Sequence, residues 1–198
     1  MAIIVGNETN SDDFIMADGA NDNINSLQAD DTVNGGAGND NIFGFLGDDL
    51  LIGGQGKDTL SGHNDNDTLL GGSNNDILNG GNHNDYLSGG TGNDILDGSG
   101  VGPGIGFANQ FDTLAGGAGA DVFVLGETAF GSYYLGTGRA TITDFSQAAG
   151  DTIQLAGSAN QYSFAFNGTD TLISQGGDRI AVVQGVGLAD VVTSLDFV

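Results

Sequence analysis

The sequence has no cysteine or tryptophan, a single proline, and three basic residues among 198. Without cysteine the chain can form no disulfide, thiolate nucleophile or cysteine-ligated zinc site. Lys57, Arg139 and Arg179 are set against 26 acidic residues, which gives a net charge of −23. We therefore expect no nucleic-acid partner, because phosphate binding needs clustered Lys and Arg. No apolar run approaches the roughly 18 residues that span a bilayer, so we expect no membrane insertion either.

The acidic residues are almost all aspartate. Only Glu8 and Glu127 are glutamate, the other 24 of the 26 are aspartate, and the chain also contains 37 glycines. General solubility would be served by either acid, whereas short carboxylates beside glycines favour turns and metal ligation. Such a composition by itself indicates disorder, so the spacing of these residues decides the interpretation.

A nine-residue period governs that spacing. When the chain is read in nines from Glu8, twelve units carry aspartate at the sixth position and an apolar residue at the eighth. The aspartates are Asp13, Asp22, Asp31, Asp40, Asp49, Asp58, Asp67, Asp76, Asp85, Asp94, Asp112 and Asp121. The apolar residues are Ile15, Ile24, Val33, Ile42, Leu51, Leu60, Leu69, Leu78, Leu87, Leu96, Leu114 and Phe123.

This repeat predicts a solenoid of stacked coils. The six glycine-rich residues that begin a unit suit a tight turn, because glycine accepts positive φ. The last three suit a short strand whose middle side chain points inward. Two units form a coil of 18 residues, and parallel pairing stacks the coils at roughly 4.8 Å. We therefore predict an all-β fold, a parallel β-roll (β-solenoid) with a β-rich C-terminal cap.

The most regular units carry a specific resemblance. Residues 35–43 read GGAGNDNIF, residues 53–61 read GGQGKDTLS and residues 89–97 read GGTGNDILD. Over about residues 8–124 these units resemble the Gly- and Asp-rich nonapeptides of the RTX (repeats-in-toxin) family of calcium-binding repeats. The resemblance implies a right-handed β-roll, bound Ca²⁺, and secretion by a type I system that reads a C-terminal signal, which agrees with the lack of an N-terminal signal-peptide pattern.

The resemblance also implies the ligands of about five strong calcium sites. In the family, one turn supplies its sixth-position Asp and the carbonyls of positions one and three. The turn one coil later supplies its own Asp and the carbonyls of positions two and four. The aspartates would be Asp40, Asp58, Asp76 and Asp94 along one edge, and Asp49, Asp67 and Asp85 along the other. The carbonyls would belong to Gly35, Ala37, Gly53, Gly54, Gln55, Gly56, Gly71, Gly72, Ser73, Asn74, Gly90 and Gly92 on the first edge, and to Gly44, Leu46, Gly62, His63, Asn64, Asp65, Gly81 and His83 on the second. Weaker sites would involve Asp22, Asp31, Asp112 and Asp121.

A metal-free interpretation stays open from the sequence alone, in which these aspartates only close Asx-type turns. Carboxylates stacked one coil apart repel by roughly 1 kcal/mol in water and about 3.5 kcal/mol at an effective dielectric constant of 20, which opposes that interpretation. His63 and His83 lie in turns, without a third nitrogen or sulfur ligand in the pattern. We interpret both as turn residues rather than as transition-metal ligands or catalytic bases.

Three segments are expected. Residues 1–7 would form an N-terminal cap strand, residues 8–124 the β-roll, and residues 125–198 the C-terminal cap with the secretion region. The stretch near 98–111 breaks the period. A loop insertion there would stack Asp112 on Asp85, whereas a strict count would stack Asp112 on Asp94. Residues 195–198 fit either a last cap strand or an export signal.

The predicted function is a secreted, non-enzymatic module that folds on binding several calcium ions. Two alternatives stay open: a structural or adhesive protein in which calcium only stiffens the rod, and the secretion or folding module of a larger hydrolase or toxin. Positions seven and nine should point outward, and the face with Leu50, Ile52, Leu70 and Tyr86 is the more apolar one. Such patches mark interfaces, so we expect self-association through this face or packing of the cap on it.

Overall fold

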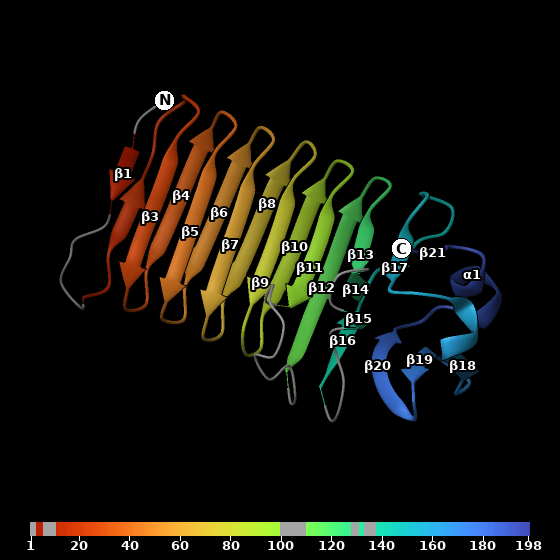
Figure 1. Ribbon diagram of the computed structural model, residues 1–198. Helices are drawn as coiled ribbons and strands as arrows, with labels where there is room; N and C mark the ends of the chain where they lie inside the picture. Colours follow the sequence, from red (N-terminus) through yellow and green to blue (C-terminus); the bar gives the residue numbers. More distant parts are fainter. Residues whose placement is uncertain (1–2, 6–10, 100–109, 128–130, 133–137) are drawn as a thin grey trace.

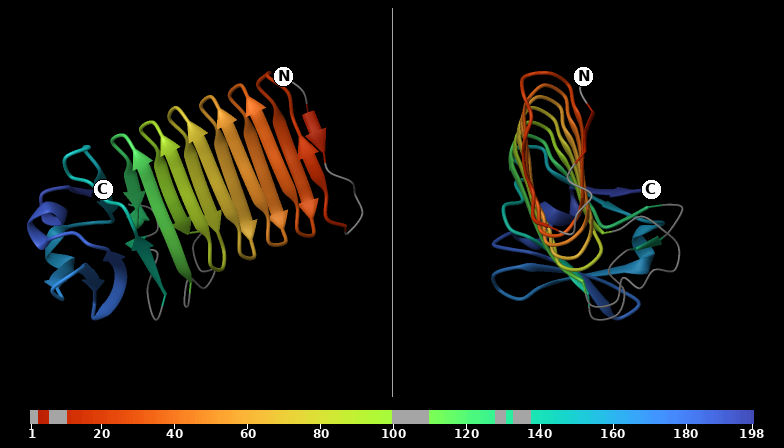
Figure 2. Two further views of the ribbon diagram at one scale, coloured as in Figure 1. Left: turned by 180° about the vertical axis from the view of Figure 1, so that it is seen from behind. Right: turned by 90° about the vertical axis from the view of Figure 1, so that its left-hand side faces the viewer.

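A computed structural model describes residues 3–5, 11–99, 110–127, 131–132 and 138–198. In this part of the chain almost every element is a strand, and successive strands alternate between two long sheets. Figure 1 shows the strands stacked along the length of the molecule. Figure 2 shows, in the view along the stack, coils that superimpose as nested, flattened loops. The predicted all-β parallel roll is confirmed.

The described residues place nine strands in one sheet and ten in the other. The first sheet runs β1 (Ile3–Val5), β3 (Asn23–Gln28), β5 (Asn41–Leu46), β7 (Thr59–Asn64), β9 (Ile77–Gly81), β11 (Ile95–Ser99), β13 (Val122–Val124), β17 (Thr152–Leu155) and β21 (Leu195–Phe197). The second runs β2 (Phe14–Met16), β4 (Thr32–Ala37), β6 (Leu50–Gln55), β8 (Thr68–Ser73), β10 (Tyr86–Thr91), β12 (Phe111–Ala118), β16 (Arg139–Ile142), β20 (Asp178–Val183), β19 (Thr171–Gln175) and β18 (Tyr162–Phe166). The short pair β14 (Gly126–Glu127) and β15 (Gly131–Ser132), a 3-10 turn (Ala159–Gln161) and the helix α1 (Leu188–Val192) complete the set.

Strands of neighbouring coils pair in parallel with an offset of 18 residues, as in the pairs Val33–Leu51 and Leu51–Leu69. Beyond β10 and β11 the offset becomes 27 residues, because Leu87 pairs with Leu114 and Leu96 with Phe123. The structure therefore has the register of the loop insertion, not that of the strict count. Most of the inserted stretch, residues 100–109, lies outside the described residues.

The strands are longer than the sequence predicts. Most strands of the roll contain six residues, because positions one to three of the next unit continue the pairing, as in Gly54–Gly72 and Gln55–Ser73. The expected three-residue strand is therefore wrong, and the turn shrinks to positions four to six. Paired glycines here allow two coils to approach along their whole length.

The eighth-position residues form the core between the two sheets. From Ile24 to Phe123 each of them is 0% exposed. Burial of one such side chain contributes about 1.5–3 kcal/mol, and each coil adds two of them. The core thus grows as a double row along the roll, and every coil depends on its neighbours.

The C-terminal region continues the same two sheets before it closes them. Strands β16 and β17 pair in parallel with β12 and β13, so the sheets do not break at residue 125. Strands β18, β19 and β20 then form an antiparallel cap, and the Phe145 ring packs against Phe123 of the last repeat with centroids 6.1 Å apart. The β-rich cap that the sequence predicts is present. No helix in the described residues is long and apolar enough to cross a membrane.

The chain's last strand, β21, pairs with β17, and the N–H of Val198 donates to the carbonyl of Leu155 at 3.0 Å. The tail is therefore a cap strand. Its role in export stays a prediction.

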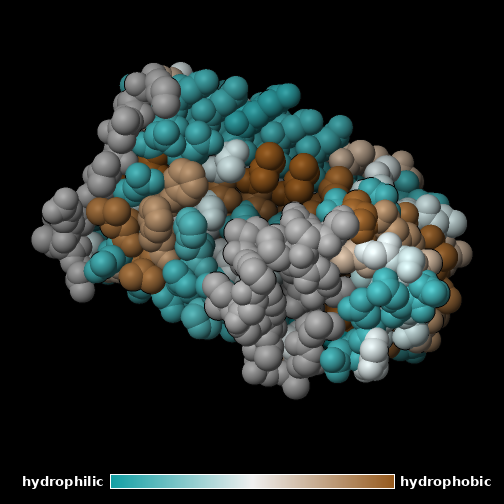
Figure 3. All heavy atoms as spheres, viewed as in Figure 1, coloured by the Kyte–Doolittle hydropathy of each residue, from teal (hydrophilic) through white to brown (hydrophobic). Residues whose placement is uncertain are grey.

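Apolar side chains also lie on the outer faces. On the face predicted for self-association, Tyr86 is 42% exposed, and Leu50, Ile52 and Leu70 are half-buried. On the opposite face Ile77 is 47% exposed. Figure 3 shows hydrophobic residues along the middle of one face below a hydrophilic band at the turns. Strands β16 and β20 of the C-terminal region extend the second sheet at its end. Self-association through the face with Leu50, Ile52, Leu70 and Tyr86 stays a prediction.

Candidate metal centres

The sixth-position aspartates form a buried ladder along each edge of the roll. From Asp22 to Asp121 they are at most 3% exposed. At each step the backbone N–H of one aspartate donates to Oδ1 of the aspartate one coil later, at 2.7–2.9 Å. Each carboxylate is therefore fixed by one oxygen and points back toward the preceding coil.

The second carboxylate oxygen is buried but not hydrogen-bonded. Within the described residues this holds for Oδ2 of Asp31, Asp40, Asp49, Asp58, Asp67, Asp76, Asp85, Asp94 and Asp121. A buried polar atom without a partner costs about 1–3 kcal/mol, and more if it is charged. These oxygens are therefore the clearest sign in the fold that a cation belongs at the turns.

Glycine at the first position of the unit keeps the space beside that oxygen open. A Cβ added to Gly53 would stand 2.5 Å from Oδ2 of Asp58 and 2.7 Å from the carbonyl oxygen of Gly71, one coil later. Carboxylate and carbonyl oxygens thus converge on one cradle. The same cradle recurs at Gly35, Gly44, Gly62, Gly71 and Gly89. No three acidic or histidine side chains meet among the described residues, so backbone carbonyls have to supply much of any ligand set.

The turn carbonyls point in two directions. Carbonyls of positions two and four face the later coil, since those of Gly36 and Gly38 abut Gly54 and Gly56. Carbonyls of positions one and three face the earlier coil, as that of Gln55 does when it accepts from the Gly38 N–H at 2.8 Å.

The carbonyls therefore face the opposite way from the expected assignment, because sequence spacing does not reveal which way a peptide group faces. Which of them bind metal stays a prediction. Between Asp40 and Asp58 the facing carbonyls belong to Gly36, Gly38, Gly53 and Gln55, and those of Gly35 and Ala37 serve the preceding coil. The sequence analysis missed Gly36, Gly38, Phe45, Gly47, Gly80, Asn82, Gly89 and Thr91 as members of these cradles.

Positive φ at positions two and four produces this alternation. Gly54 and Gly56 have φ of 109° and 132°. Where glycine is missing the same conformation persists, with 77° at His63, 75° at Asp65 and 76° at Asn74. Asn, Asp and His tolerate it best among non-glycine residues. The turn shape is thus uniform along the roll even where the sequence is not.

Burial raises the pKa of the ladder carboxyl groups from Asp31 to Asp94 and of Asp121. It raises the pKa of Asp85 to about 9, of Asp67 to about 8, and of Asp49 and Asp76 to about 7. Hydrogen bonds from the backbone of the preceding coil oppose this increase, and neighbouring aspartates add to it. In the protein alone these groups resist ionisation near neutral pH, and a divalent cation would supply the missing charge.

The two histidines do not act as nitrogen ligands of a cluster in the described structure. The His63 ring stacks on Phe45 with centroids 4.7 Å apart, and burial lowers its pKa. Nδ1 of His83 accepts a hydrogen bond of 3.1 Å from the Asp65 N–H. His63 is a strand residue at position two of its unit, in β7, and its carbonyl faces Gly81 one coil later, whereas His83 is a turn residue at position four.

The weaker candidates share the ladder geometry. Asp112 stacks on Asp85 and Asp121 on Asp94, and each accepts the expected N–H hydrogen bond. At the N-terminal end, Asp22 and Asp31 are equally buried. Their first-position residues are Ala17 and Ser26 rather than glycine.

Two other groups of residues were missed. Fifth-position Asn and Asp side chains form an outer ladder, in which Oδ1 of Asn39 accepts from the Lys57 N–H at 2.9 Å and Oδ1 of Asp48 from the Asn66 N–H at 2.8 Å. Recurrence of Asn or Asp at that position was the available signal. In the cap, Asp144 accepts from the N–H groups of Gly116 and Gly117, both at 2.9 Å. No period marks Asp144, so sequence spacing could not identify it.

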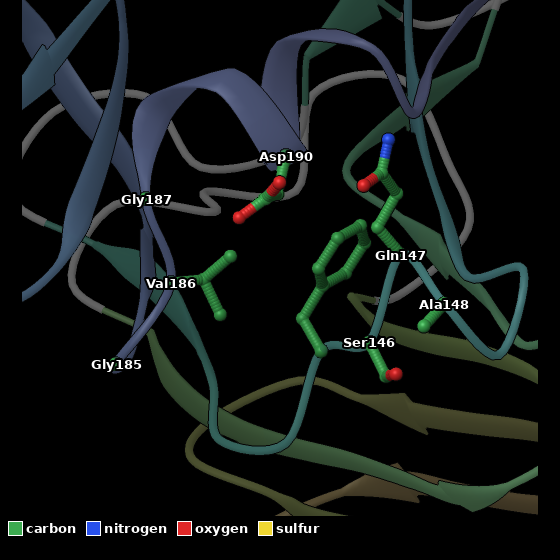
Figure 4. A pocket seen from close by; sticks show the side chains of 8 residues that line it. Ser146, Gln147, Ala148, Gly185, Val186, Gly187 and Asp190 are labelled. Atoms are coloured by element: carbon green, nitrogen blue, oxygen red, sulfur yellow. The ribbon is translucent and has the colours of Figure 1, made fainter.

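The cap also holds an open pocket of about 340 Å³. Figure 4 shows that loop residues after β16 and residues around the start of α1 line it. Its lining residues are Phe145, Ser146, Gln147, Ala148, Gly185, Val186, Gly187 and Asp190. Asp190 is the single titratable group in this lining, so the pocket does not assemble an acid–base pair.

Comparison with known proteins agrees with the repeat. A family model described as RTX calcium-binding nonapeptide repeat (4 copies) matches residues 9–42, 27–60, 43–78, 61–96 and 109–127. No curated protein matches the chain.

Two solved structures are similar at low identity. The extracellular lipase LipA from Serratia marcescens is 15% identical, with a TM-score of 0.32, over 96% of this chain and 40% of the lipase. The AlgE6R3 subunit of the Azotobacter vinelandii mannuronan C5-epimerase is 17% identical, with a TM-score of 0.28, over 96% of this chain and 82% of that subunit. The chain thus spans less than half of the lipase.

Proposed function

This chain belongs to the family of RTX calcium-binding nonapeptide repeats, and from that premise we propose that it is a secreted, non-catalytic module whose roll is held together by calcium ions along both edges. The observation that carries the proposal is the row of buried Oδ2 atoms without hydrogen-bond partners, which from Asp40 to Asp94 and at Asp121 lie beside a first-position glycine. Oxygen-only surroundings suit Ca²⁺, which takes six to eight hard oxygen ligands.

Seven cradles combine two stacked sixth-position aspartates of the repeat with a first-position glycine. Four lie between Asp40 and Asp58, Asp58 and Asp76, Asp76 and Asp94, and Asp94 and Asp121; three lie between Asp49 and Asp67, Asp67 and Asp85, and Asp85 and Asp112. Four plus three gives seven proposed ions, two more than the sequence alone indicates. The additional two follow from the register beyond the insertion.

Each residue type has a separate task in such a site. Every interior aspartate serves two neighbouring ions, because Oδ1 reaches the earlier coil and Oδ2 lies in the cradle of its own turn. First-position glycines keep the cradle open, and positive φ at positions two and four turns carbonyls toward the next coil. The cation supplies the positive charge that lets stacked carboxylates ionise together.

Secretion and the lack of catalysis are also part of the proposal. Calcium-dependent folding would match a chain that is exported from a calcium-poor compartment to a calcium-rich one.

Direct counting of bound metal tests the function. Protein purified with calcium and passed through a desalting column should retain about seven Ca²⁺ per chain by plasma emission spectrometry. EGTA treatment should remove them, and excess Mg²⁺ should not replace them, because Mg²⁺ prefers a smaller, rigid octahedral shell. Protein without stoichiometric calcium under these conditions would refute the proposal.

A further inference from the structure

Ser26 is the polar exception at the first position of the repeat. In the described units that position is glycine at residues 35, 44, 53, 62, 71, 80, 89 and 116, and alanine at residue 17. Ser26 is 0% exposed. It belongs to the turn of Asp31, on the edge that continues with Asp49 and Asp67.

The Ser26 hydroxyl stands where the corresponding space of other turns is open. Its Oγ donates to the carbonyl oxygen of Gly44 at 2.9 Å and lies 3.3 Å from that of Phe43. The Gly44 carbonyl is the counterpart of the Gly71 carbonyl over Gly53. Oδ2 of Asp31 is buried without a hydrogen-bond partner, as in the other turns, and the hydroxyl lies close enough to this carboxyl group to lower its pKa, against the larger raising effect of burial. It therefore lies between the same two oxygens that converge in the glycine cradles.

The rest of this turn has the geometry of the other turns. Leu27 and Ala29 have φ of 86° and 80°, and the carbonyl of Ala29 abuts Gly47 one coil later. The Asp31 N–H donates to Oδ1 of Asp49 at 2.8 Å. The serine side chain is thus what distinguishes this turn from one with an open cradle.

We propose that Ser26 closes the calcium site between Asp31 and Asp49, so that the metal ladder on this edge begins between Asp49 and Asp67. The inference rests on the proposed function. A hydroxyl group supplies a hydrogen bond to the carbonyl but no charge, and its Cβ and Oγ fill the space that a cation needs. The coil of Asp31 is then joined to the coil of Asp49 by hydrogen bonds, while the following coils on this edge are joined by metal. Removing only the side chain should open a further site, because the backbone cradle already exists.

Native mass spectrometry at a saturating concentration of calcium acetate tests this inference by counting ions on the intact chain. Ser26→Gly should bind one Ca²⁺ more than the wild type. Ser26→Ala is the matched control, since Cβ still fills the cradle, and it should bind the same number as the wild type. The double variant Ser26→Gly/Asp31→Asn should lose the added ion, because that ion needs the Asp31 carboxylate.

The outcomes separate this inference from the function. If Ser26→Gly and the wild type bind the same non-zero number of ions, the inference fails and the function stands. If the wild type binds none, both fail. Failure of Ser26→Gly to fold in calcium would also overturn the inference, because glycine is what eight other units carry at this position. A far-UV circular dichroism spectrum of each variant in calcium detects that case.

Discussion

The backbone N–H of Asp58 donates a hydrogen bond of 2.8 Å to Oδ1 of Asp76, one coil later, while Oδ2 of Asp76 is buried and not hydrogen-bonded. One carboxylate is thus divided between two tasks. Oδ1 connects adjacent coils by a hydrogen bond, and Oδ2 is the oxygen that we propose as a calcium ligand. Because this relationship repeats along both edges, loss of one aspartate should affect two neighbouring sites.

Asp76→Asn tests this division of tasks. Asparagine retains an oxygen that can accept from the Asp58 N–H, but it replaces Oδ2 with an NH₂ group that cannot ligate calcium. We expect the loss of the ion between Asp76 and Asp94, with a decrease of about 2.7 kcal/mol in the calcium-loaded free energy of unfolding for one site at a hundredfold excess over Kd. The ion between Asp58 and Asp76 should bind more weakly, because its ligand oxygen remains but the carboxylate charge is lost. Asp12→Asn, an exposed residue, is the control and should change neither quantity. Retention of the full ion count by Asp76→Asn would contradict the shared-ligand geometry.

Gly53→Ala tests the cradle. Its Cβ would stand 2.5 Å from Oδ2 of Asp58 and 2.7 Å from the Gly71 carbonyl, and the second atom is backbone that cannot move easily. We expect one calcium ion to be lost, with a destabilisation of about 1–3 kcal/mol from overpacking in addition. Gly19→Ala is the matched control, because nothing lies within 4 Å of a Cβ there. Calorimetric titration with calcium measures the number of ions bound by each of the two variants. Equal stoichiometry in Gly53→Ala and Gly19→Ala would refute the role of the glycine.

The repeat made the fold and most site aspartates predictable, because a period of nine fixes which residues stack. It did not fix the orientation of peptide groups. The carbonyls of Gly36 and Gly38 face the later coil only because position two has φ above zero, and no side chain reports that direction. The role of Asp144 could not be predicted for a different reason. It accepts a hydrogen bond from the Gly116 N–H of the last repeat, but it lies in a region of the sequence without a period. The hydroxyl of Ser26 was visible in the sequence only as a missing glycine.

Leu78→Ala should report the contribution of the core. Leu78 is 0% exposed, and removing it from a close-packed row costs about 2–5 kcal/mol. Ile77, its neighbour in the chain, is 47% exposed, so Ile77→Ala should cost about 0.5 kcal/mol or less. Urea denaturation of both variants in saturating calcium measures the difference. Equal losses would mean that the outer face that carries Ile77 is covered in solution.

The raised carboxyl pKa values predict how pH acts on the calcium-free protein. Because the folded pKa values exceed the ordinary value of 3.8, their contribution to stability is complete below pH 3.8 and is lost as pH rises through about 7 to 9. Protein dialysed free of calcium should therefore hold more β-structure at pH 4 than at pH 9. With saturating calcium the order should reverse, since protons compete with the metal for the same carboxylates. Circular dichroism across this pH range, without and with calcium, checks whether the two curves of β-structure against pH have opposite slopes. Asp85→Asn should flatten the calcium-free curve near pH 9. Parallel curves would contradict the link between burial and metal binding.

The last prediction is that calcium is the folding switch of the roll. Without metal at neutral pH, the aspartates stacked one coil apart along both edges have two options. They ionise and repel one another in a buried site, or they stay protonated because burial has raised their pKa. Net charge of −23 adds a general repulsion. Seven divalent ions would bring fourteen positive charges, twice seven, to the places where carboxylates are most crowded. At about 2.7 kcal/mol per site for a hundredfold excess over Kd, several sites together exceed the roughly 5–15 kcal/mol that holds an ordinary domain folded.

Coils contact only their neighbours, so folding should be cooperative in calcium and should spread along the roll. A calcium titration of metal-free protein at pH 7.5, followed by far-UV circular dichroism, should show a steep transition from a disordered to a β spectrum with a Hill coefficient above one. Magnesium at the same concentrations is the control and should leave the spectrum disordered. Asp76→Asn should shift the midpoint to higher calcium, whereas Asp12→Asn should not. A complete β spectrum in the metal-free protein, unchanged by millimolar calcium, would show that hydrogen bonds and the leucine rows suffice, and that calcium is incidental to the fold.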